Sequence, residues 1–237
     1  MINSKADYLI QENIQLPSLP AVAIKILDAV KEEETALVKL AEIISVDPAL
    51  SAKMLKVANS SLFALSNEVT SISRAIIVLG IDSVKNIALS FVLIKNMSSN
   101  DVTGVDIDYF WRRSISIAVS AELLSTHLNY TDDSMFLTAL LQDLGLLAIL
   151  SRGNQEDNIF LYQKGTDHKD LIQREREHFG FDHQQVGYSL FQSWNFPESI
   201  SIPILHHHCP DMVPKRYQTE TKILFFADRL ANIYHQK

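Results

Sequence analysis

The sequence is poor in the residues that build disulfide frameworks and turn-rich sheets. Its 237 residues include one cysteine, seven glycines and seven prolines. Cys209 has no second cysteine to pair with, so an internal disulfide is excluded; with no signal-peptide pattern, this favours a reducing cytoplasm. The longest apolar run, Phe136 to Leu150, is shorter than the roughly 20 residues of a membrane-spanning helix, and two polar residues interrupt it. We therefore expect a soluble, cytoplasmic protein.

Clustered positive charge is also missing. Lys and Arg total 21 against 28 acidic residues, a formal net charge of −7, and no basic cluster that could track a phosphate backbone is visible. Nucleic acid and anionic membranes are therefore poor candidate partners. The chain does have apolar residues in quantity, 47% of the total, which is enough for a sizeable core.

These apolar residues recur at three- and four-residue spacing, which predicts an all-α protein. Asp47 before Pro48 predicts a helix start, Gly80 a helix end and Asp182 an N-cap. The second expected helix has Thr35 as its N-cap, and the fifth has Asp82 or Ser83. The expected helices cover about residues 22–30, 36–44, 48–59, 71–79, 83–97, 107–128, 133–150, 168–178, 183–194, 198–208 and 220–235.

One polar, turn-rich stretch, residues 98–106, is the best candidate boundary. It divides the chain into an N-terminal part of short helices, residues 1–100, and a C-terminal part, residues 101–237. Residues 151–158 are expected to form a solvated turn and residues 209–221 an irregular connection. No Gly-rich phosphate loop or nucleophile elbow is apparent.

Several residues in the C-terminal part are able to bind a divalent metal, and they fall on different predicted helices. They are Asp143, His183, the triplet His206 to His208, and Asp228. Carboxylates and imidazoles that converge in a helical bundle can hold an ion that activates water. Each residue also has an ordinary explanation, such as an exposed histidine or a surface ion pair. Asp143 is the exception, because its flanking residues are apolar and an unpaired buried carboxylate is costly.

The spacing of the adjacent histidines limits how they can act together. Neighbouring residues on a helix point about 100° apart. His207 and His208 are therefore expected to serve two ions, or to act as one ligand and one supporting donor, rather than to bind one ion from the same face.

Several motifs together resemble the HDOD domain, a bacterial signalling module related to the HD phosphohydrolases. In the first half these are "LPSLPAVAIKILDAV", "IISVDPALSAKMLKVANSSLF" and "SISRAIIVLGIDSVKNIAL". In the second half they are "FWRRSISIAVSAELLS", "ALLQDLGLLAIL", "DHQQVGYSLFQSWNFPESISIPILHHHCP" and "ILFFADRLAN". The resemblance covers roughly residues 15–235. It implies an N-terminal bundle of short helices packed on a degenerate HD-like helical core, and a chain that is this module alone.

The sequence departs from the metal-dependent relatives at two positions. The resemblance implies that Arg113 and Gln142 stand where the enzymes carry histidine ligands, while Asp143, His183, His207, His208 and Asp228 occupy the places of the remaining acidic and imidazole groups. A neutral amide is a weak metal ligand and a guanidinium is a fixed cation. We therefore expect Arg113 to neutralise Asp143 directly, and no metal, cofactor or catalytic residue.

The resemblance implies a non-catalytic signal-transduction module that binds an unknown signalling protein, in bacterial regulatory and cyclic-dinucleotide networks. An aromatic residue such as Phe63 would then lie on a binding surface or in the core. The alternative is a residual phosphohydrolase of the HD type that uses Mn, Fe or Zn. A third hypothesis is a pocket in which the histidines and Arg113 receive the phosphate of a nucleotide. Sequence leaves the partner and the oligomeric state open.

Overall fold

A computed structural model describes residues 10, 14, 16–59, 67–97, 104–132, 134–153, 155–162 and 168–235. Within these ranges every regular element is helical, so the predicted all-α class is confirmed. None of the helices in the described ranges is long and apolar enough to cross a membrane. Phe63 and residues 98–103 of the predicted boundary lie outside the described residues.

The described residues form two compact units. The N-terminal unit comprises Leu19–Asn96 together with Asp132–Leu137, and the C-terminal unit comprises the remaining described residues. The helices of the N-terminal unit are α2 (Ala21–Ala29), α3 (Glu33–Val46), α4 (Pro48–Ala58), α5 (Ile72–Leu79) and α6 (Ile81–Met97). Met97, the last residue of α6, belongs to the other unit.

In the N-terminal unit, α3 packs against α2, α4 and α5, and α4 also packs against α5. Their buried faces include Ile26, Leu40, Ile44, Met54 and Ile76. Other apolar residues of α2 and α3 lie outside these buried faces, among them Val22, which is 41% exposed, and Leu37, which is 36% exposed. Helices this short bury only a narrow stripe, here Ala23 and Ile26 on α2.

Local capping signals explain where several of these helices begin and end. The Asp47 side chain accepts hydrogen bonds from the backbone N–H groups of Ala49 and Leu50, and Pro48 occupies the first turn of α4. Gly80 closes α5 with a φ of 85°, a conformation that a residue with a Cβ rarely adopts. The prediction that Thr35 is an N-cap is wrong, because α3 begins two residues earlier, at Glu33.

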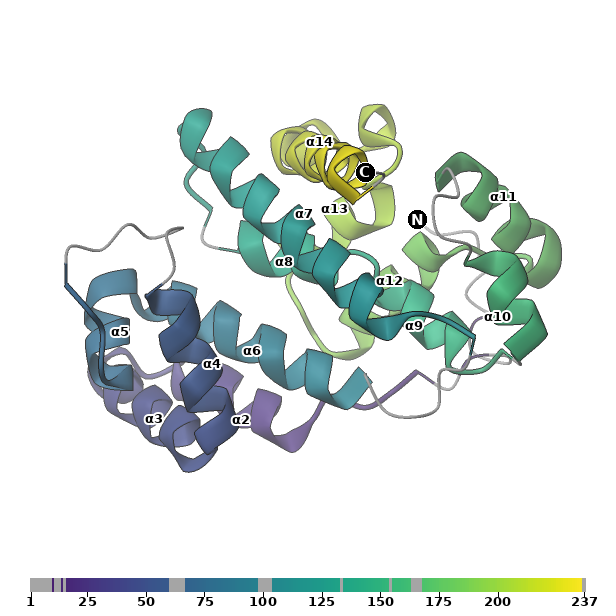
Figure 1. Ribbon diagram of the computed structural model, residues 1–237. Helices are drawn as coiled ribbons and strands as arrows, with labels where there is room; N and C mark the ends of the chain where they lie inside the picture. The colour runs from purple at the N-terminus through teal and green to yellow at the C-terminus, as the bar shows by residue number, and fades with distance from the viewer. Residues whose placement is uncertain are drawn as a thin grey trace. The chain divides into compact units, whose positions relative to one another are not determined.

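The C-terminal unit holds α7 (Ile107–His127), α9 (Leu144–Leu150), α10 (Gln155–Leu161), α11 (His168–Phe179), α12 (His183–Ser193), α13 (Glu198–His206) and α14 (Gln218–His235). Two 3-10 turns, η1 (Pro210–Met212) and η2 (Lys215–Tyr217), precede α14. The helix α14 packs along α7, and α12 lies between α9 and α13 (Figure 1).

Two parts of the predicted helix pattern are wrong in this region. The expected helix 133–150 is interrupted at Gln142 and Asp143, which form a turn between α8 (Met135–Leu141) and α9. The expected solvated turn 151–158 ends early, since α10 begins at Gln155. Its Asn158 is buried and donates from Nδ2 to the Leu150 carbonyl at 2.9 Å, which ties α10 to the end of α9.

Candidate functional site

An arginine and two aspartates form the buried centre of the C-terminal unit. Arg113 on α7 donates from Nη1 to Asp143 Oδ2 at 2.7 Å and from Nη2 to Asp228 Oδ1 on α14. Its Nε donates to Asn232 Oδ1 at 2.9 Å. The predicted contact between Arg113 and Asp143 is therefore present. The preceding residue, Arg112, points outward, and its Nη2 lies 3.8 Å from Asp106 Oδ2.

Arg113 and Asp143 hold each other in the charged state. Burial by itself lowers the pKa of Arg113, but the carboxylates of Asp228 and Asp143 outweigh it and raise that pKa. Burial likewise acts to raise the pKa of Asp143, yet the neighbouring guanidinium keeps it well below its ordinary value. Both side chains are almost fully shielded from water, so removing either partner leaves an uncompensated buried charge.

Three histidines face the other oxygen of Asp143. Oδ1 lies 3.3 Å from Nε2 of His207 and 3.8 Å from Nε2 of His183. Nε2 of His183 in turn lies 3.2 Å from Nε2 of His208. One ligand atom from each of these four residues lies within 4.8 Å of all the others. The structure thus brings together four of the five candidate site residues predicted from sequence.

The expectation that His207 and His208 cannot face one ion is wrong. It assumed that both residues lie on a helix, whereas α13 ends at His206 and the next two residues form a turn. The turn frees the two side chains from the helical spacing, and their ring centroids lie 3.9 Å apart. His206, the last helical residue, is not part of the donor group.

Asp228 and Gln142 lie beside this donor group rather than in it. Asp228 pairs with Arg113, and Gln142 Nε2 lies 3.4 Å from Asp228 Oδ1. The amide oxygen Oε1 of Gln142 is buried and has no hydrogen-bond partner among the described residues. The ordinary explanation of Asp228 as part of a surface ion pair does not apply, because Asp228 is buried and pairs with Arg113. The guanidinium of the next residue, Arg229, lies over the Phe225 ring at 3.6 Å.

One residue of the site, Glu175, was missed in the sequence. Glu175 on α11 is fully buried, and its Oε2 lies 2.7 Å from Nδ1 of His183 and accepts from the His183 backbone N–H at 3.0 Å. Burial by itself lowers the pKa of His183, but Glu175 and then Asp143 raise it to about 9. Glu175 follows the buried Leu171 by one helical turn, a weak signal inside a strongly charged segment.

A glycine allows His183 to approach Asp143. A Cβ on Gly145 would lie 2.1 Å from the His183 carbonyl oxygen and 2.5 Å from the Gly187 nitrogen. The backbones of α9 and α12 therefore touch at this point, which only glycine permits. The capping box of Asp182 with Gln185 fixes the first turn of α12, and His183 is its first residue.

The side chains present fit a single transition-metal ion. Imidazole nitrogens together with one carboxylate oxygen form a donor set that suits zinc or iron. His183 and His207 have their second ring nitrogens against Glu175 and the Ile204 carbonyl, the usual support for metal-binding histidines. Such an ion would supply a Lewis acid and an activated water, while Arg113 would hold Asp143 in place.

Comparison with known proteins gives a consistent result. The family model of the HDOD domain matches residues 16–210. An uncharacterised protein of Treponema pallidum (strain Nichols) is 24% identical over 223 residues, which cover 90% of this chain and 41% of that protein. This chain thus spans less than half of that relative.

Solved structures show the same fold. An HDOD domain protein of unknown function from Geobacter sulfurreducens superposes with a TM-score of 0.79 at 23% identity, over 96% of this chain and 76% of the other. A protein of Shewanella amazonensis SB2B, provisionally named a phosphohydrolase, gives 0.80 at 25% identity, over 99% and 84%. The response regulator MmoQ of Methylococcus capsulatus str. Bath gives 0.50 at 27%, over 91% and 87%.

Proposed function

Because this chain belongs to the HDOD domain family, we propose that it is a cytoplasmic, non-catalytic signal-transduction module that acts by binding another protein. Its setting is bacterial regulation, including cyclic-dinucleotide networks. The similarity to the response regulator MmoQ supports a regulatory role. The observation that carries the non-catalytic part of the proposal is the position of Arg113.

Arg113 places a permanent positive charge where the related hydrolases carry a metal ligand. Its guanidinium occupies one oxygen of Asp143 and one of Asp228, the two carboxylates that would otherwise bind a cation there. A guanidinium cannot lose its proton at physiological pH and cannot bind a metal. The pair therefore stabilises the fold in place of an ion and leaves no room for a two-metal hydrolytic centre.

The partner surface we favour is one face of α14. Four large apolar or aromatic residues are solvent-exposed along this helix at the spacing of one face: Phe226 (54% exposed), Leu230 (48%), Ile233 (61%) and Tyr234 (73%). A continuous exposed apolar stripe of this kind typically marks a protein interface. An amphipathic segment of a signalling protein would bury it in the manner of a helix laid against a helix.

Replacing Leu230 by glutamate is expected to abolish partner binding while leaving the helical circular dichroism spectrum unchanged. Quantitative mass spectrometry of proteins captured by wild type and by L230E measures this loss directly. Thr219→Glu is the matched control, since it adds the same charge at an exposed position near the start of the same helix. Equal capture by all three proteins would reject α14 as the partner surface.

A residual phosphohydrolase is the alternative, favoured by the four donors around Asp143 and by the name of the Shewanella amazonensis SB2B relative. It requires a hydrolytic ion held without Arg113 and Gln142. A nucleotide pocket that uses Arg113 is less well supported. The guanidinium is 6% exposed and already pairs with two carboxylates, so an incoming phosphate would have to displace them.

A further inference from the structure

We propose that Asp143, His183, His207 and His208 bind one transition-metal ion such as zinc. This ion stabilises the C-terminal unit and performs no hydrolysis. This inference goes beyond the proposed function and does not depend on any partner. It rests on the spacing of the four donors, on how their second ring nitrogens are held, and on the buried charge around them.

The donor spacing matches a four-coordinate ion. A tetrahedral zinc ion with bonds of about 2.1 Å separates its ligand atoms by about 3.4 Å. The donor atoms here are separated by 3.2 Å between His183 and His208, 3.3 Å between His207 and Asp143, and 3.8 Å between His183 and Asp143. These three separations lie within a few tenths of an ångström of that value, and the remaining pairs of donor atoms lie within 4.8 Å of one another.

The Nε2 nitrogens of His183 and His207 face the donor group, while other groups hold the Nδ1 nitrogens of the same rings. Nδ1 of His207 donates to the Ile204 carbonyl at 2.6 Å, because a carbonyl oxygen can only accept. In the neutral ring the lone pair is then on Nε2 of His207, a buried atom that lies 3.3 Å from Asp143 Oδ1. A buried nitrogen of this kind is costly unless a cation or donor meets it. Glu175 holds His183 in the corresponding way.

The buried charges call for one divalent cation. Glu175, Asp143 and Asp228 are buried carboxylates around the guanidinium of Arg113. With the histidines neutral, as metal binding requires, two negative charges remain. One divalent ion balances them. Because Arg113 already lies between Asp143 Oδ2 and Asp228, the ion binds on the Oδ1 side only, and the stoichiometry is one.

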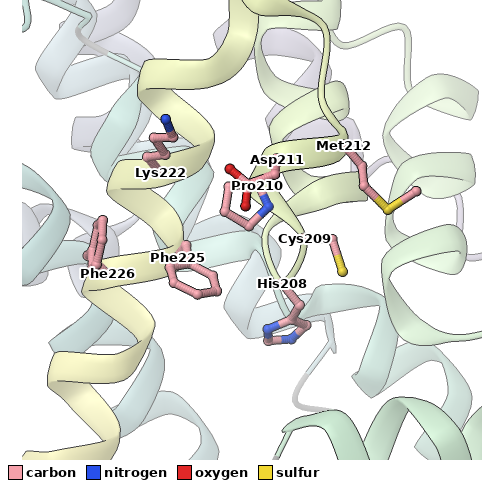
Figure 2. A pocket seen from close by; sticks show the side chains of 8 residues that line it. All are labelled: His208, Cys209, Pro210, Asp211, Met212, Lys222, Phe225 and Phe226. Carbon is pink, nitrogen blue, oxygen red and sulfur yellow. The ribbon is translucent and has the colours of Figure 1, made fainter.

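An entry route reaches the fourth ligand. His208 is only partly buried and lines an open hollow of about 390 Å³ beside the first turns of α14 (Figure 2). Cys209, Pro210 and Phe225 are among the other residues of this hollow. Of the four donor residues His208 alone is not fully buried, so an ion would reach the donor group from this side.

The test is titration of the EDTA-treated, refolded full chain with Co²⁺, read by the visible spectrum of the bound ion, and with Zn²⁺, read by calorimetry. We expect one equivalent of either ion, a tetrahedral cobalt spectrum and a raised melting temperature. His208→Ala should lose at least about tenfold in zinc affinity, since even changes to supporting groups of metal ligands cost that much. His206→Ala, the neighbouring histidine outside the donor group, should bind as wild type does.

Three results would overturn the proposal: no stoichiometric ion in wild type, two equivalents of ion, or wild-type affinity in both His208→Ala and His207→Ala. His208 is partly exposed, so its alanine variant should keep the helical circular dichroism spectrum. Binding is measured without partner or substrate, so its failure leaves the proposed signalling role untouched, and loss of partner capture leaves the metal result untouched.

Discussion

Replacing Arg113 by alanine is expected to lower the free energy of unfolding by about 3–5 kcal/mol, the cost of leaving a buried ion pair without one partner. The side chain is 6% exposed and its removal strands Asp143 and Asp228 together in the core. Their mutual repulsion adds to the cost of burying each one. Thermal or urea unfolding of the metal-free protein measures the loss, which corresponds to roughly 10 °C in melting temperature for a chain of this size.

The control for this change is one residue away. Arg112→Ala removes an exposed guanidinium that lies 3.8 Å from Asp106 Oδ2, and should change stability by less than about 1 kcal/mol. Arg113→Lys keeps the charge but loses the planar guanidinium that reaches both carboxylates. Its loss of unfolding free energy should therefore lie between those of Arg112→Ala and Arg113→Ala. If Arg113→Ala proves as stable as Arg112→Ala, the ion-paired centre has no structural role.

Gly145→Ala is expected to lower the free energy of unfolding by a similar amount, through steric overlap rather than through a lost ion pair. The added Cβ would collide with backbone atoms of α12, 2.1 Å from the His183 carbonyl oxygen, and backbone cannot move aside as a side chain can. Overpacking costs about 1–3 kcal/mol even where side chains can adjust, so we expect a loss of at least about 3 kcal/mol in unfolding free energy. Urea unfolding followed by circular dichroism measures it.

Gly187→Ala is the matched control, because a Cβ there would meet nothing nearer than the Ile204 side chain at 3.2 Å. It should cost clearly less than Gly145→Ala. The comparison also bears on the site, since a separation of α9 from α12 moves His183 away from Asp143. Equal stability of the two variants would show that the close contact is not needed to hold the donor group.

Much of the fold could be predicted because its signals are local. Asp47 with Pro48, Gly80 and Asp182 each act within one helical turn, and the structure shows all three at helix ends. The apolar spacing identified the helices for the same reason. The break at Gln142 and Asp143 could not be predicted, because these residues leave the helix to meet Arg113 and Asp228 from distant parts of the chain.

The site was predictable in its residue types and less so in its geometry. Asp143 stood out as a carboxylate in an apolar run, and Arg113 followed from the resemblance to the HD enzymes. Glu175 was missed because its segment is dominated by charge and its one partner, His183, lies beyond the end of the helix. The joint orientation of His207 and His208 depends on where α13 ends, which a histidine triplet does not reveal.

We propose that in this core a side chain takes the place that a cation holds in the related hydrolases. Arg113 balances part of the carboxylate charge, and the three histidines with Asp143 retain the means to hold one ion on the other side. On this proposal the stability of the unit and the lack of two-metal chemistry have the same cause, a guanidinium that cannot be released or deprotonated.

The most direct test of the central claim, that the core is non-catalytic, is a phosphodiesterase assay of the metal-loaded chain. Cyclic dinucleotides and a chromogenic phosphodiester are incubated with the protein in manganese or iron, beside the His208→Ala variant. We expect no turnover above that of the metal-containing buffer. Turnover that requires the wild-type chain and disappears in His208→Ala would contradict the account and establish a hydrolase.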